Sequence, residues 1–216
     1  MHTFDTPTPI STVLAVPAGR VRIVGADRAD TVVEVRPADA SKGRDVRAAQ
    51  QTEVEYRGGV LRIEAPSTGR SGSVEVTVQL PAGSNVEAKA AATEFRAVGR
   101  LGDVAFDGAY RNISVDDAAT LRLTASDGDV EVGRLGGPAE ISTQRGDIRI
   151  AEATRGKVVL RTRSGDISVG AATGVSASLD AGTGHGRVSN ALKNDGTAGL
   201  DVHATTDHGD IAARSL

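Results

Sequence analysis

The chain has 216 residues with 25 basic and 28 acidic side chains, and it contains 26 glycines, no Cys and no Trp. The lack of Cys excludes disulfides, thiolate nucleophiles and Cys-ligated zinc, and the near balance of charge argues against a general binder of nucleic acid or anionic membranes. Because only 2% of the residues are aromatic, Val, Ile, Leu and Ala must fill the interior in thin layers, and the glycines indicate many tight turns.

Residues 1–90 predict an irregular, β-rich start that caps the rest of the chain. Strand-like alternation beside glycine turns occurs at 17–24 and 54–63, and the polar stretch 41–51 can hold one short helix. The N-terminus lacks the basic and apolar segments of a secretion signal, and no apolar run is long enough to cross a membrane. We therefore expect a cytoplasmic protein without a membrane segment.

From residue 91 onward, a Gly-Asp turn returns at a steady interval. Its glycines are residues 128, 146, 165, 186 and 209, which lie 18 to 23 residues apart, and the copy at 186 is degraded because Arg187 stands in place of Asp. Apolar and polar residues alternate on both sides of each turn, and Thr lies three residues before the glycine in four of the five copies. Each copy therefore predicts two short, half-buried strands joined by a corner.

A repeat of this length is typical of a solenoid. A run of antiparallel hairpins is the alternative, but hairpins do not need the same residue in the same column, whereas a solenoid stacks each column on itself. We therefore predict an all-β, right-handed parallel β-solenoid with coils of about 18–23 residues. It would form a single domain over 1–216, with regular coils at 91–216 and a closing unit at 200–216.

The corner carboxylates are the first candidate site. Asp129, Asp147 and Asp166 would form a ladder of oxygen ligands for Ca²⁺. Gly and Asp are also what tight turns require, and calcium-binding solenoids repeat about every nine residues with a second glycine pair, which this chain lacks. We therefore predict that these residues form turns, and that the chain has no metal ion or other cofactor.

Three other groups of residues have the chemistry of a site, but we predict a structural role for each. The tripeptide 145–147 spells the integrin motif but is the repeat's own turn, and a basic stretch resembles an anion or nucleic-acid patch but has no interleaved aromatic residue. A histidine group beside acidic residues has the chemistry of a zinc site or an acid-base pair, yet two of its histidines directly precede turn glycines. We predict no catalytic, cofactor or metal residues. The basic stretch is Arg145, Arg149, Arg155, Lys157, Arg161 and Arg163, and the histidine group is His185, His203 and His208 with Asp201, Asp207 and Asp210.

The segment 78–86 reads Val-Gln-Leu-Pro-Ala-Gly-Ser-Asn-Val. It resembles the "strand, Leu-Pro-x-Gly, strand" motif of the bacterial putative-adhesin family of β-strand-repeat proteins, a domain-of-unknown-function family. The Ser/Arg-Gly-Asp-Ile/Val repeats also resemble that family, and the end of the chain, from 184–190 through 208–211, is similar to its closing units. The resemblance implies a β-solenoid without an established activity and without catalytic residues to carry over.

The leading functional hypothesis is a non-enzymatic scaffold or adhesin-like interaction module that binds another protein. A carbohydrate-binding or carbohydrate-acting β-helix protein is the second hypothesis, and two carboxylates facing each other across a groove would favour it. The third is a self-assembling structural protein, in which deletion of the terminal unit from residue 200 onward produces filaments.

Overall fold

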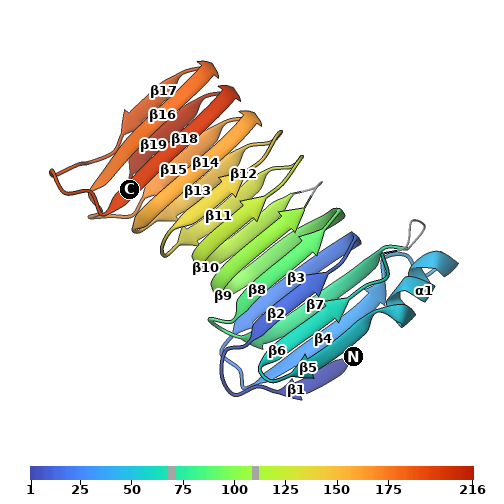
Figure 1. Ribbon diagram of the computed structural model, residues 1–216. Coiled ribbons are helices and arrows are strands. Elements are labelled where there is room, and N and C mark those ends of the chain that lie inside the picture. The colour runs from blue at the N-terminus through green and yellow to red at the C-terminus, as the bar shows by residue number, and fades with distance from the viewer. Residues whose placement is uncertain (68–71, 109–111) are drawn as a thin grey trace. The chain divides into compact units, whose positions relative to one another are not determined.

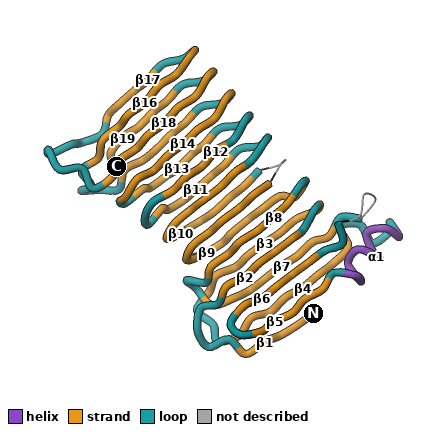
Figure 2. The backbone as a smooth tube through the Cα atoms, viewed as in Figure 1, coloured by secondary structure: helices purple, strands orange, loops and turns teal. Residues whose placement is uncertain are grey.

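The computed structural model describes residues 1–67, 72–108 and 112–216, and in these ranges the protein is almost entirely β (Figure 1). The chain divides into two compact units, Met1–Arg111 and Asn112–Leu216. Within each unit the strands lie side by side and the turns gather at their ends (Figure 2). None of the helical residues in the described ranges forms a segment long and apolar enough to cross a membrane. The expectation of a single domain over 1–216 stays a prediction.

The first unit contains strands β1 to β9 and helix α1. Short alternating segments form these strands because every second side chain is buried, as in β7, where the valines at 74, 76 and 78 are buried. The helix confirms the prediction for 41–51. The elements are β1 (His2–Asp5), β2 (Ser11–Ala15), β3 (Ala18–Ala26), β4 (Asp30–Pro37), α1 (Gly43–Gln51), β5 (Glu53–Arg57), β6 (Val60–Glu64), β7 (Val74–Pro81), β8 (Asn85–Ala90) and β9 (Ala92–Gly108).

Parallel and antiparallel pairs are mixed in this unit. Strand β2 lies between β6 and β8, and β3 lies between β7 and β9, all in parallel. The pairs β1–β4, β4–β7 and β5–β6 are antiparallel. The buried carboxylate of Asp45 fixes α1 to the neighbouring loop by accepting a hydrogen bond from the amide of Ser73, at 3.0 Å. The pairing in the first unit is therefore mixed, and the division into an irregular start over 1–90 and regular coils over 91–216 stays a prediction.

The second unit contains ten strands. They are β10 (Ile113–Thr124), β11 (Val130–Leu135), β12 (Ala139–Ser142), β13 (Ile148–Ala153), β14 (Gly156–Ser164), β15 (Ile167–Ala171), β16 (Ala177–His185), β17 (Val188–Ala191), β18 (Leu200–His208) and β19 (Ile211–Ser215). They form two rows. The β11 row runs β10–β11–β13–β15–β19–β17, and the β12 row runs β10–β12–β14–β18–β16.

Every pair in these two rows is parallel, and residues in the same column of the repeat lie beside one another. In the β11 row, Val130 pairs with Ile148, Ile148 with Ile167, and Ile167 with Ile211, and all four side chains are buried. The predicted alternation of buried and exposed positions is therefore confirmed for these coils. The right hand of the solenoid stays a prediction.

The prediction that residues 200–216 close the stack is wrong in one respect. Strand β18 lies between β14 and β16, and β19 lies between β15 and β17. The last strands of the sequence are therefore inserted into the stack, and β16 and β17 form its outer edge, as Figure 1 shows. The segment 192–199, which has no strand structure, connects the edge strand β17 back to β18.

Candidate functional site

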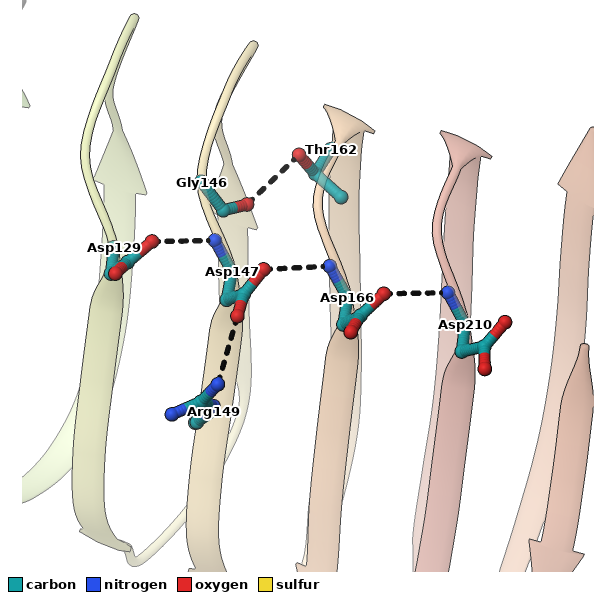
Figure 3. Close-up of polar contacts among 7 residues, drawn as sticks. All are labelled: Asp129, Gly146, Asp147, Arg149, Thr162, Asp166 and Asp210. Atoms are coloured by element: carbon teal, nitrogen blue, oxygen red, sulfur yellow. Dashed lines mark hydrogen bonds and ion pairs between the residues drawn. The ribbon is translucent and has the colours of Figure 1, made fainter. Parts of the chain in front are cut away.

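The corner aspartates of the second unit form a ladder of hydrogen bonds (Figure 3). Oδ1 of Asp129 accepts a hydrogen bond from the backbone amide of Asp147, at 2.9 Å. Oδ1 of Asp147 accepts one from the amide of Asp166, also at 2.9 Å, and Oδ1 of Asp166 accepts one from the amide of Asp210, at 2.7 Å. Each carboxylate thus fixes the corner of the next coil, as side-chain acceptors do in tight turns.

The turn glycine and the repeated threonine complete each corner. Gly165 has a φ of 150°, and a Cβ atom there would overlap the carbonyl oxygen of Gly146. The column of corner glycines therefore lets adjacent turns approach closely. The buried hydroxyl of Thr162 donates to the carbonyl of Gly146, at 3.2 Å, and that of Thr206 donates to the carbonyl of Gly165, at 3.1 Å. These bonds explain why Thr recurs in the column.

The ladder ends at Arg187. Its amide donates to Oδ1 of Asp210, at 2.9 Å, and its guanidinium donates to Oδ2 of the same carboxylate, at 3.0 Å. The hydrogen bond from the Arg187 amide is the main cause that holds the pKa of the Asp210 carboxyl below its ordinary value, and the hydrogen bond from the guanidinium is the next. The arginine side chain has no oxygen that could accept a hydrogen bond from the corner of another coil. The degraded repeat at 186–187 therefore lies at the end of the ladder.

A shallow groove of about 400 Å³ lies on the outward side of the β11 row, over β10, β11, β13, β15 and β19. Small residues line it at Gly133, Ala151 and Gly170. A Cβ atom at Gly133 would overlap the carbonyl oxygen of Asp116, and one at Gly170 would overlap that of Ala151. Close approach of neighbouring strands thus requires glycine here, and the missing side chains leave the depression.

The charges around this groove are separated along it. Asp116 on β10 and Glu131 on β11 lie toward one end, whereas Arg149 on β13 and Arg214 on β19 lie toward the other. Nη2 of Arg149 is held 2.8 Å from Oδ2 of Asp147. Sequence reasoning missed this groove. The available signal was a glycine inside a strand pattern, at residues 133 and 170, which often marks a close backbone approach.

Comparison with protein families identifies the chain. The family model described as Toastrack, DUF4097, matches residues 19–215. The chain belongs to the Toastrack family. Its membership confirms the resemblance to a domain-of-unknown-function family that the segment 78–86 and the Gly-Asp repeats predicted. Among curated proteins, no sequence matches it.

Two solved structures are similar to this Toastrack chain over nearly all of its length. A putative adhesin from Bacteroides fragilis NCTC 9343 is 12% identical with a TM-score of 0.52, and the match covers 98% of this chain and 95% of that one. A putative cell adhesion protein from Clostridium sporogenes ATCC 15579 is 14% identical with a TM-score of 0.41, and the match covers 100% and 98%. The Bacteroides fragilis protein and this chain therefore share a fold.

In the Toastrack chain, the corner carboxylates do not converge on a common point. Among the residues that the structure describes, no three His, Cys, Asp or Glu side chains are arranged to hold a metal ion. Asp129, Asp147 and Asp166 each use one carboxylate oxygen on a backbone amide. Their geometry is that of turn formers, and the chain's lack of a metal ion or other cofactor stays a prediction.

The basic stretch does not form one patch. Arg149 lies on β13 in the β11 row, whereas Arg161 lies on β14 in the β12 row. Several members are also paired: Nη2 of Arg145 lies 2.9 Å from Oδ2 of Asp127, and Nη1 of Arg161 lies 3.2 Å from Oε1 of Glu140. In the tripeptide 145–147, both charged side chains are thus engaged within the fold. Arg155 donates to a backbone carbonyl, and Lys157 and Arg163 lie on β14.

The three histidines of the predicted group lie in two places. The rings of His185 and His208 stack at the corner, with centroids 4.8 Å apart and planes 2° apart. His203 lies elsewhere on the β12 row, where its Nδ1 is 3.2 Å from Oδ2 of Asp180. Beside it, the hydroxyl of Ser178 donates to Asp201, at 2.6 Å. Sequence reasoning missed the residues on β16, because their neighbours depend on the insertion of β18. Asp207 lies next to His208 in the sequence, and Asp210 belongs to the ladder.

Proposed function

We propose that this Toastrack protein is a non-enzymatic, adhesin-like scaffold that binds an extended segment of another protein in the groove of the β11 row. In this proposal the chain is a right-handed β-solenoid that works in the cytoplasm. The observation that carries it is the groove itself, with its floor of small residues and its separated charges. An extended segment fits such a floor because Gly133, Ala151 and Gly170 carry little or no side chain, and charge at the two ends fixes its direction.

The partner segment expected from this charge pattern is itself polar. A basic residue would lie toward Asp116 and Glu131, and an acidic residue toward Arg149 and Arg214. Within the described ranges, Arg214 makes no ion pair, so its guanidinium is available to a ligand. The name of the Bacteroides fragilis relative, a putative adhesin, supports a binding role over catalysis.

The test places a bulky side chain in the groove. Ala151→Trp fills the floor, and Thr205→Trp on the exposed side of β18 is the matched control. A photo-crosslinking residue at position 168, at the groove margin, should join the full-length protein to its partner in native lysate, and A151W should reduce the crosslinked product at least tenfold while T205W leaves it unchanged. Equal crosslinking in both variants would rule out the groove as the binding site.

A carbohydrate ligand is the second candidate, because Asp116 and Glu131 both line the groove. They lie on the neighbouring strands β10 and β11, toward the same end, and the residues that line the groove include no aromatic side chain to stack on a sugar. Glycan-array binding that disappears in A151W would favour this candidate over the protein partner. Release of reducing sugar by the wild type, lost in Glu131→Gln, would favour an enzyme.

A further inference from the structure

The edge formed by β16 and β17 differs from the rest of the second unit. Within the described ranges, β16 pairs only with β18, and β17 pairs only with β19. Val188 is 46% exposed, whereas Ile211, its neighbour in the same column, is 1% exposed. Leu179 is half-buried, although the equivalent Val202 on β18 is buried. The last coil therefore leaves apolar side chains open, together with the outer side of the β16 backbone beyond Ala177, whose amide donates to the carbonyl of Lys193, at 2.9 Å.

Beyond the start of β16, where the segment 193–195 bonds to Ser176 and Ala177, this edge lacks the usual protection of exposed strands. Charged side chains, bulges and covering segments normally prevent an open edge from pairing with another chain. The first unit has them: its edge strand β5 is antiparallel and exposes Glu53, Glu55 and Arg57. Strand β16, by contrast, spans nine residues with Asp180 as its one acidic residue and no Lys, Arg or Pro. An open strand of this length and composition is suited to pair with another strand.

The sequence of β16 is compatible with pairing to itself. In an antiparallel pair centred on Ala181, Asp180 lies opposite Gly182 of the second copy, so no two carboxylates meet. Leu179 lies opposite Thr183 on the side that faces the core, which places an apolar side chain beside a small one. Because the same strand serves both copies, such a contact is isologous and closes after two chains.

We propose that two copies of the chain associate end to end through β16, with the exposed apolar side chains of the last coil buried between them. Arg187 favours this antiparallel, closed arrangement over continued growth, because it offers no carboxylate to the corner of a further parallel coil. The product is a dimer with two-fold symmetry, and not a filament. This inference does not depend on the groove of the β11 row, which lies over other strands.

Two substitutions at one position test the contact by charge. Gly182 has open space around its Cα, so both Gly182→Asp and Gly182→Lys fit the monomer. In the dimer, residue 182 lies opposite Asp180, twice by symmetry. G182D should raise the dimer Kd roughly tenfold through like-charge repulsion, and G182K should leave it unchanged or lower it. Sedimentation velocity of the full chain over a range of concentrations measures both, and unchanged thermal melting at low concentration shows that the monomer folds.

A cysteine at the symmetry centre gives a second measurement. The chain has no native Cys, so Ala181→Cys can form only a disulfide between copies, and directly opposite residues of an antiparallel pair have Cβ atoms about 4.5–5.5 Å apart. Mild oxidation should convert A181C to a covalent dimer, while Thr205→Cys, exposed on β18, stays monomeric on the same timescale. Three results would overturn the proposal: a wild-type chain that is monomeric at all concentrations, a wild-type chain that forms filaments, or equal dimer Kd values for G182D and G182K. A monomeric chain is also the result expected if a different protein occupies this edge.

Discussion

The two units use the same kind of strand in different ways. In the second unit every pair of the two rows is parallel, and a corner residue therefore meets its own counterpart in the next coil, as Asp129, Asp147 and Asp166 do. In the first unit, antiparallel pairs interrupt the columns, and among the residues described there the comparable bond runs from the amide of Asp103 to Oδ1 of Asn85, at 2.8 Å. Repetition in the sequence thus marks the places where parallel stacking makes each column contact itself.

The largest difference in stability between the two units is expected for substitutions at turn glycines. In the second unit, Gly165→Ala puts a Cβ atom into the carbonyl oxygen of Gly146 at a φ of 150°. We expect a loss of about 3 kcal/mol or more in the free energy of unfolding, from backbone strain and the steric overlap. In the first unit, Gly58→Ala has a φ of 58° with open space around it, so a loss of about 1 kcal/mol is expected. Urea unfolding measures both, and equal losses would show that stacking does not restrict the corner.

The buried threonines give a smaller effect of opposite sign in the two units. Thr162→Val removes a hydroxyl that donates to the carbonyl of Gly146, and a loss of about 1–2 kcal/mol is expected. Thr12 in the first unit is buried, and its Oγ1 has no hydrogen-bond partner within the described ranges. Thr12→Val should therefore leave stability unchanged or raise it by up to about 1 kcal/mol. Chemical denaturation measures the free energy of unfolding of both isosteric variants. A larger loss for T12V than for T162V would contradict the roles given to the two hydroxyls.

Substitutions in the aspartate ladder are expected to have the smallest effect on stability. Asp147→Ala removes the acceptor for the amide of Asp166 and the partner of Arg149, so a loss of about 1 kcal/mol is expected. Asp147→Asn keeps an acceptor oxygen, and Asn85 already fills this role in the first unit. The Asn variant should therefore retain most of the stability. If Asp147→Asn and Asp147→Ala were equally destabilised, the negative charge and not the hydrogen bond would be the stabilising feature.

Much of the regular fold could be predicted from the sequence. The alternation around residues 128–169 identifies the strands, and the repeated Gly, Asp and Thr identify the corner, because each residue type solves the same local problem in every coil. The chemistry of Gly, Asp and Thr thus accounts for the corner without a ligand. The family, too, was visible in the segment 78–86.

The order of the strands could not be predicted in the same way. The segment 200–215 has the same alternation as its neighbours, so it fits any position in the stack, and the period does not record which coil lies beside which. The pairing of Asp180 with His203 follows only from the insertion of β18. In retrospect, Arg187 was the available sign, since a corner without a carboxylate suits the end of a ladder. The groove was missed because the sequence shows glycines at 133 and 170 but not which backbone lies against them.

The insertion of β18 and β19 also has a consequence for how the protein is made. The ribosome releases β16 and β17 before the strands that lie between them and β14 and β15 have been synthesised. These coils therefore cannot be completed one by one as the chain emerges, and the contacts of β16 and β17 wait for the synthesis of β18 and β19. Until then the nascent chain carries open strand edges on β14 and β15.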